Sequence, residues 1–279
     1  MNILVKMDYF ANGERATSIG IVADGCSFRN PCGILCRNQE YEYVYGEFSY
    51  CVAPARKTFD GEPLDMQVIV RQARKYSILD VIQPRADWIV RFSVLRRDVR
   101  NPIRPLSTAQ LRLADSIIEA ESEDLEHAVA AWVGLWTVSG VTGLDYSDVG
   151  TLAKGARSIA RQVQLSTSDF KGKLKRFLPA LLPKRQERTG LIVVVTHRGN
   201  VSLSIWEDVM KAINKQVSAE PEVDILQQCF VLPDMHPDHM RIVIFDCSNV
   251  GSDSSKPAAS ASGMTKRGAR QIADESGEE

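Results

Sequence analysis

The chain has 279 residues, of which 44% are hydrophobic and 25% are charged, and its formal net charge is -1. This composition is typical of a soluble globular protein of one or two domains, and the charge balance excludes duplex nucleic acid as an obvious partner. The first residues, MNILVKMDYFANGER, lack the apolar core of a signal peptide, and no apolar run could span a bilayer. We therefore expect a cytoplasmic protein without a transmembrane segment.

Strands are predicted for much of the first hundred residues. The segments 1–7 (MNILVKM), 17–25 (TSIGIVADG) and 88–90 (WIV) fit single strands, and 41–52 fits a strand pair or one long strand. Residues 68–82 (VIVRQARKYSILDVI) have apolar positions at helical spacing.

Cysteines are concentrated in the same region, where Cys26, Cys32, Cys36 and Cys51 account for four of the six. Structural zinc sites usually combine two close pairs such as C-x-x-C. The gaps here are irregular and no histidine is near, so the pattern favours small buried residues over zinc. We expect no metal, and the role of these four residues stays open.

A phosphate-binding glycine loop is missing from this region. Neither G-x-x-x-x-G-K-[ST] nor G-x-G-x-x-G occurs, and residues 1–105 contain no run of glycines. Such glycines let backbone N–H groups approach a phosphate closely. The sequence therefore argues against a self-contained nucleotide site of a common design.

The longest helical pattern follows. Ser107 is a candidate N-cap, and an apolar stripe from Leu111 to Trp136 predicts a helix from about 108 to 138, about 45 Å long if continuous. The polar patch Glu119–Glu126 interrupts the stripe, so two helices are the alternative. A continuous helix could bridge two subdomains, and a core helix of a single domain is the simpler alternative.

The stretch SGVTGLDYSDV (139–149) ends this pattern and places two carboxylates, Asp145 and Asp148, at the start of the next helix. Carboxylates there can cap free backbone N–H groups and meet the positive end of the helix dipole, at about 1 kcal/mol each. Helix capping is therefore the simplest explanation of the pair.

The remaining residues predict an α/β domain. Residues 158–165 fit a strand or a continuing helix, 170–182 a basic amphipathic helix, 190–196 a buried strand, 202–217 a helix, and 223–232 and 240–246 two strands. For the basic segment KGKLKRF (171–177), a solvated face is favoured over membrane or acidic-partner binding. From 248 to 279 small polar residues dominate, which predicts a disordered tail.

Asp234, His236, Asp238 and His239 lie within the connection between the last two predicted strands. These residue types could bind a metal ion, but in so short a connection a solvated polar turn is the favoured interpretation.

Several of these segments together resemble the FtsZ branch of the tubulin superfamily. The family's loop G-x-x-N-x-D-F-x-D-V corresponds in register to Gly140–Val149, which includes Asp145 and Asp148. The segments AVAAWVGLWTVSG, FLPALL, GLIVVVT, NVSLSIWEDV and VLPDM-x-x-D-x-M-R-I-V-I (231–244) are similar to those around it in the family. Upstream, 52–61 and 71–90 are similar to the end of the family's GTPase domain, so the resemblance covers about 50–247.

The resemblance implies an α/β fold with four parts: a reduced FtsZ-like N-terminal half-domain (1–106), a long central helix (107–140), an FtsZ-like C-terminal mixed-sheet domain (141–247) and a disordered tail (248–279). It implies a cytoskeletal, cell-division-type protein whose partner is an FtsZ/tubulin-like filament subunit or a second copy of itself.

Two departures from the family qualify that function. The signature G-G-G-T-G-T-G is missing, and Gly143 replaces the loop asparagine. We therefore expect no cofactor on this chain, with GTP bound by a partner subunit. In the family the loop acids enter the next subunit's pocket and polarise the attacking water, so Asp145 and Asp148 are candidate catalytic residues in trans. A divergent FtsZ-like GTPase and a non-polymerising scaffold or adaptor on the same fold are the alternatives.

Overall fold

The computed structural model describes residues 2–11, 14–24, 49–54, 64–71, 86–95, 114–137, 144, 146–184, 188–198, 202–220, 223–231 and 235–249. The strands are β1 (Asn2–Ala11), β2 (Glu14–Asp24), β3 (Ser49–Pro54), β4 (Leu64–Arg71), β5 (Ala86–Val94), β6 (Ser116–Ala120), β7 (Ala156–Ser166), β8 (Arg188–His197), β9 (Asp224–Val231) and β10 (His239–Asn249). The helices are α3 (Leu125–Thr137), α4 (Tyr146–Ala153), α5 (Phe170–Leu181) and α6 (Leu203–Val217).

These strands form one ten-stranded sheet in the order β3-β1-β2-β4-β5-β6-β7-β10-β8-β9. From β2 to β7 all neighbouring strands are parallel, whereas β1 is antiparallel to both β2 and β3. Strand β10 runs antiparallel between β7 and β8, and β9 is parallel to β8. We call β1–β6 the N-terminal half and β7–β10 with α5 and α6 the C-terminal half.

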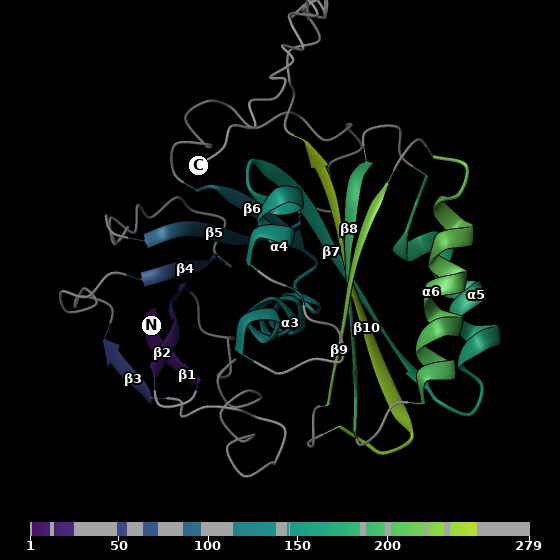
Figure 1. Ribbon diagram of the computed structural model, residues 1–279, viewed down its shortest axis with the longest axis horizontal. Coiled ribbons are helices and arrows are strands. Elements are labelled where there is room, and N and C mark those ends of the chain that lie inside the picture. Colours follow the sequence, from purple (N-terminus) through teal and green to yellow (C-terminus); the bar gives the residue numbers. More distant parts are fainter. Residues whose placement is uncertain are drawn as a thin grey trace, which may run out of the picture.

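Helices cover both faces of the C-terminal half (Figure 1). On one face the sheet packs against α3 and α4, and on the other against α5 and α6. Strand β8 shows why: Ile192 and Val194 belong to the core under α3, while Leu191, Val193 and Val195 belong to the core under α5 and α6. A strand that is buried on both faces needs an unbroken apolar run, and GLIVVVT provides one.

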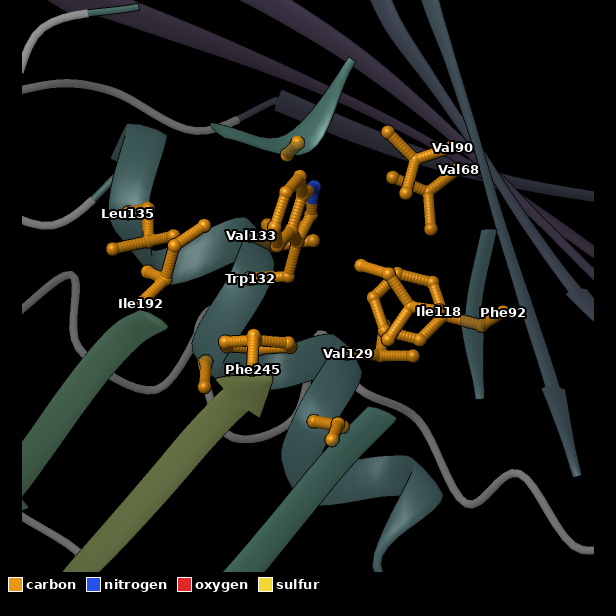
Figure 2. Packing of buried hydrophobic residues seen from close by; sticks show 14 of the residues in the cluster. Val68, Val90, Phe92, Ile118, Val129, Trp132, Val133, Leu135, Ile192 and Phe245 are labelled. Carbon is orange, nitrogen blue, oxygen red and sulfur yellow. The ribbon is translucent and has the colours of Figure 1, made fainter. Parts of the chain in front are cut away.

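Helix α3 joins the two halves. Figure 2 shows Trp132 between Val68, Val90, Phe92 and Ile118 of the N-terminal half and Phe245 of the C-terminal half. The ring of Trp132 is fully buried, and its centroid lies 6.4 Å from that of Phe92 and 5.4 Å from that of Phe245, both in edge-to-face geometry. One helix therefore serves as the common core of both halves.

The predicted central helix over 107–140 is wrong in its middle part. Residues Ser116–Ala120 form strand β6, paired with β5 on one side and β7 on the other, and only Leu125–Thr137 is helical. Residues 107–113 and 138–140 lie outside the described residues. The error has a physical cause: β6 is buried on both faces, so SIIEA carries apolar residues on each side and matches a helical stripe equally well.

Two further predictions need correction. Residues Val68–Arg71 belong to strand β4 and do not begin a helix, and the rest of the predicted 68–82 helix lies outside the described residues. The short connection between the strands predicted at 223–232 and 240–246 also favours a hairpin, and this prediction is wrong, because β10 inserts between β7 and β8 while β9 pairs with β8 at the edge. Pairing partners depend on the whole sheet, which the local pattern does not encode.

The other predicted elements are confirmed where the structure describes them. The strands predicted at 1–7, 17–25, 88–90, 190–196, 223–232 and 240–246 correspond to β1, β2, β5, β8, β9 and β10, and the helices predicted at 170–182 and 202–217 correspond to α5 and α6. The ambiguous segment 158–165 is part of strand β7. Within 41–52 the structure shows β3 from Ser49, and residues 41–48 lie outside the described residues, as do Cys26, Cys32 and Cys36. The disordered tail predicted for 248–279 is wrong at its first two residues, because Ser248 and Asn249 belong to strand β10, and its remaining residues lie outside the described ones. Within the described part of the chain, no helix has the length and apolar character needed to cross a membrane.

Candidate functional site

Helix α4 lies on the same side of the sheet as α3 and contacts β7, β8 and β9 (Figure 1). Its inner face consists of Val149, Leu152 and Ala153, all buried. Leu152 packs directly over Gly190 of β8, where a Cβ atom would lie 2.7 Å from Leu152 Cδ2. The glycine in an otherwise branched strand is therefore what allows α4 to lie this close to the sheet.

The C-terminal end of α4 is fixed to the N-terminal half by hydrogen bonds. Ser116 Oγ donates to Ala153 O at 2.6 Å, and Trp88 Nε1 donates to Ser116 Oγ at 2.9 Å. Gly155 follows the helix with φ of +76° and donates its backbone N–H to Asp115 O at 2.7 Å. A left-handed glycine of this kind is a common helix ending. These contacts hold α4 in one position and leave its first turn at the surface.

Asp148 lies in that first turn, and its side chain is exposed. Asp145 lies outside the described residues, so the structure gives no distance between the two predicted site residues. Ser147 and Thr151 are exposed on the same helix, and Thr151 Oγ1 donates to Ser147 O at 2.9 Å. A carboxylate on a short, fixed helix can accept a hydrogen bond from a neighbouring molecule or orient a water molecule there.

In open α/β sheets, ligands usually bind at the carboxyl ends of the parallel strands. In the N-terminal half, these are the ends of β2, β4, β5 and β6, which we call the carboxyl edge of the sheet. Helix α3 begins at this edge, after the turn that follows β6. The turn and the first residues of α3 carry the carboxylates of Glu121, Glu123, Asp124 and Glu126. A helix N-terminus attracts phosphate, but four carboxylates around it repel the same group.

A cluster of ionisable residues at the start of α3 was not predicted from the sequence. Burial raises the pKa of Asp124, which hydrogen-bonds to Gln162 of β7. Burial and, secondarily, the charge of Arg241 lower the pKa of His127 to about 4, so His127 is neutral at pH 7. Burial lowers the pKa of Arg241 as well, and its Nη2 donates to Gln164 Oε1 at 3.1 Å. No spacing in the sequence connects residues so far apart, so only the pairing of β7 with β10 brings them together.

A second unpredicted group is a buried ion network around Arg188. Its Nε donates to Asp246 Oδ1 at 2.8 Å, its Nη1 is paired with Glu220, and its Nη2 donates to Pro183 O at 2.8 Å. The side chains of Arg188 and Asp246 are both fully buried, and the two carboxylates raise the pKa of Arg188 against the effect of burial. The network ties together β8, β10 and the residues that follow α5 and α6, and we assign it a structural role.

The predicted polar connection before β10 is only partly described, since Asp234 lies outside the described residues. His236 Nδ1 accepts a hydrogen bond from the backbone N–H of Asp238 at 3.3 Å, which is local turn chemistry. The rings of His236 and His239 lie 4.8 Å apart, edge to face. In the part of the chain that the structure describes, no three His, Cys, Asp or Glu side chains converge as metal ligands would. Cys229 and Cys247 are buried free thiols, and burial raises the pKa of Cys229 to about 11.

Comparison with known proteins identifies the fold. No protein-family model matches the sequence, and no curated protein matches it. Among solved structures, an empty FtsZ dimer from M. jannaschii matches with a TM-score of 0.51 and 14% identity over 68% of this chain and 64% of that chain. A mutant of the same FtsZ gives a TM-score of 0.51 and 13% identity over 67% and 66% of the two chains. GDP-bound CetZ1 from Haloferax volcanii gives 0.42 and 11% over 68% and 66%.

The likeness to FtsZ shows that this chain has an α/β fold like that of FtsZ. The chain spans just under two thirds of the length of these FtsZ chains.

Proposed function

We propose that this chain is an FtsZ/tubulin-like cytoskeletal subunit that lacks a complete GTP site of its own and joins a filament through the acidic turn at the start of α4. The observation that carries the proposal is the position of Asp148 in an FtsZ-type fold, exposed in the first turn of a helix that is fixed at its other end. The partner is an FtsZ-type subunit or a second copy of the chain, and the site of action is the cytoplasm.

Two features support the lack of a GTP site. The sequence has no phosphate-binding glycine loop. At the carboxyl ends of the parallel strands, the described residues include four acids, Glu121, Glu123, Asp124 and Glu126. Phosphate groups need backbone N–H groups and cations, and carboxylates at that edge oppose them.

In the proposed contact, Asp148 together with Asp145 would face a nucleotide that the partner subunit holds. A carboxylate there would accept a hydrogen bond from the attacking water and orient it toward the γ-phosphate. Gly143 stands where the family has asparagine, so the two aspartates would have to do this without an amide beside them. A subunit with one competent face can join one end of a filament, but no further subunit can add to it in the same way. Co-assembly or capping is the expected result.

Nucleotide binding by the isolated chain tests the first half of the proposal. We expect no saturable GTP binding in equilibrium dialysis, with an FtsZ that binds GTP as the positive control. Saturable binding would instead establish the alternative, a divergent FtsZ-like GTPase with an unfamiliar pocket.

Co-sedimentation with GTP-dependent FtsZ-type filaments tests the second half. We expect the chain to pellet with the filaments, and a chain that stays in the supernatant would favour the non-polymerising scaffold. We expect Asp148→Asn to reduce GTP turnover at mixed contacts by about 100-fold, the usual contribution of a positioned acid or base. Glu123→Gln is the matched control, because it removes the same charge from a different exposed surface. Equal turnover in the two variants would show that Asp148 has no catalytic role in trans.

A further inference from the structure

Helices α5 and α6 lie side by side in one layer (Figure 1), and both run in the same direction. In the first half of both helices, Lys171 Nζ of α5 lies 2.8 Å from Asp208 Oδ2 of α6. At their ends, Gln216 Nε2 of α6 donates to the backbone oxygen of Leu182, just after α5, at 3.2 Å. Because the two contacts follow the same order along both helices, the helices are parallel, and their outer sides form one continuous surface.

The outer side of α5 is open. Four buried residues mark the side that faces the sheet, namely Phe170, Leu174, Leu178 and Leu181. At about 100° per residue, Gly172 and Arg176 point almost directly away from that side. Lys175 follows Lys171 by one turn and therefore lies on the flank toward α6. A Cβ atom at Gly172 would meet no atom within 4 Å, so the helix surface is uncovered there.

Lys215 adds a cation from α6 to this surface. The buried side of α6 consists of Val209, Met210, Ile213 and Val217. By the same helical spacing, Lys215 points almost opposite to these residues, and its side chain is exposed. The next residue, Gln216, contacts the end of α5, so Lys215 lies beside the C-terminal half of that helix.

Three of the six cations on these two helices already have carboxylate partners. Lys171 is paired with Asp208, Lys173 with Asp169 at 2.8 Å, and Lys211 with Glu207 at 3.3 Å. The remaining three cations are exposed and form no ion pair with any residue that the structure describes. These are Lys175, Arg176 and Lys215, which we call the α5–α6 basic surface.

We propose that the α5–α6 basic surface docks this chain on an anionic lipid bilayer, with both helices lying along the lipid headgroups. The three cations belong to two helices and do not converge on one point, which suits a layer of many headgroup charges better than a single bound anion. The residues between the two α5 cations around the helix are Gly172 and Pro179. Both are small, so the longer cationic side chains beside them can reach a flat surface.

Docking of this kind is peripheral and depends on charge. The apolar sides of α5 and α6 are buried in the core beneath them, so neither helix can insert into the hydrocarbon region. Each cation near an anionic bilayer strengthens binding about five-fold, and three together on the order of 100-fold. High salt screens this attraction. The bilayer contact is therefore expected to be reversible and salt-dependent.

The bilayer contact and the proposed filament contact lie on opposite faces of the sheet. Helices α5 and α6 cover one face, and α4, which carries Asp148, lies on the other (Figure 1). Bilayer docking therefore goes beyond the proposed function and does not depend on it. Where both contacts form, the chain links a filament to a membrane.

Flotation of the full chain with lipid vesicles tests the docking. The vesicles contain phosphatidylcholine alone, or phosphatidylcholine and phosphatidylserine in a ratio of about 2:1, at a high lipid concentration because three cations give weak binding. We expect on the order of 100-fold stronger binding to the mixed vesicles. The difference should disappear in about 1 M salt, where the Debye length is about 3 Å.

Substitutions that remove the same charge from different surfaces show which surface is responsible. We expect Arg176→Gln to weaken binding to the mixed vesicles about five-fold. Neutralising Lys175, Arg176 and Lys215 together to Gln should remove the preference for these vesicles. Lys154→Gln is the matched control, because it removes one exposed positive charge at the end of α4, on the opposite face of the sheet. We expect this variant to bind as the unchanged chain does.

Lysine acetylation with and without mixed vesicles, read by mass spectrometry, tests the orientation of the docked chain. We expect Lys175 and Lys215 to react several-fold more slowly on the vesicles, because lipid headgroups cover them. Lys154 should react at an unchanged rate and serves as the internal comparator.

Three outcomes would overturn the proposal. Equal binding to both kinds of vesicle would show that the surface does not recognise anionic lipid. Equal weakening by Arg176→Gln and Lys154→Gln, or equal protection of Lys154 from acetylation, would show that the contact is not made by α5 and α6. Tighter binding to single-stranded RNA than to the mixed vesicles, with the same dependence on Arg176, would identify the occupant as nucleic acid.

Discussion

The two halves of the sheet are stabilised in different ways. In the N-terminal half, the described core between the sheet and α3 is apolar, and its buried polar groups are few and neutral, such as the Trp88–Ser116 hydrogen bond. The C-terminal half has helices on both faces and buries two charged side chains, Arg188 and Asp246. Among the described residues, the N-terminal half therefore shares its core with α3, while the C-terminal half adds a second core under α5 and α6 and an ion network of its own.

The largest expected effect comes from removing the side chain that both halves share. We expect Trp132→Ala to lower the free energy of unfolding by about 5 kcal/mol, because a fully buried ring in contact with Phe92 and Phe245 is replaced by a cavity. Urea unfolding followed by circular dichroism measures this. Phe177→Ala, at an exposed position, should change the value by no more than about 0.5 kcal/mol. A small effect of Trp132→Ala would mean that the halves do not share one core.

A change confined to the ion network should affect the C-terminal half alone. We expect Asp246→Ala to cost about 3 kcal/mol, because it leaves Arg188 buried without its main partner. Hydrogen exchange should show the loss of protection in β8 and β10 and unchanged protection in β4 and β5.

The matched control replaces both charges, with Arg188→Met and Asp246→Leu together. We expect this double variant to recover part of the lost stability, since neither fully buried charge remains, while Glu220 and Arg161 at the margin of the network each lose a partner. A double variant as unstable as Asp246→Ala would show that the network contributes more than charge compensation.

A smaller effect is expected where the two halves meet at α4. Gly190→Ala should cost about 1–3 kcal/mol, because the new Cβ would lie 2.7 Å from Leu152 and 3.1 Å from the backbone oxygen of Asp224. It should also weaken co-sedimentation with FtsZ-type filaments, since α4 would move. Reducing the contact with Leu152→Ala in the same chain should recover part of the loss. Normal stability would show that α4 can shift without cost.

The smallest effect is a pH dependence at the start of α3. The pKa of His127 falls from 6.5 to about 4 on folding, so the unfolded chain binds more protons between these values. His127 therefore destabilises the fold as pH falls from 6.5 toward 4, by about 1 kcal/mol because the ring is only partly buried. The raised pKa of Asp124 acts in the opposite direction at the acidic end. Unfolding measured from pH 7 to 4 should show a flatter profile for His127→Gln, and an unchanged profile would exclude His127 as the cause.

Local patterns predicted the elements that bury one clear face or lie deep in the sheet. The run GLIVVVT at β8, the apolar stripe of α6 and the basic amphipathic pattern of α5 each determine an element through short-range spacing. The resemblance to FtsZ also rested on such segments, and the structure has that fold. Of the candidate site, the sequence predicted the helix start that carries Asp148, because a break followed by carboxylates is a local signal.

The tertiary structure alone decided which segments become neighbours. Strand β6 was predicted as helix because its apolar residues point to both faces of the sheet. Its pairing with β5 and β7, like the place of β10 between β7 and β8, depends on partners far away in the chain. The Arg188–Asp246 pair and the effect of the Arg241 charge on His127 have the same origin. Spacing encodes which face of an element is apolar, but the identity of the surface that covers that face is a property of the whole fold.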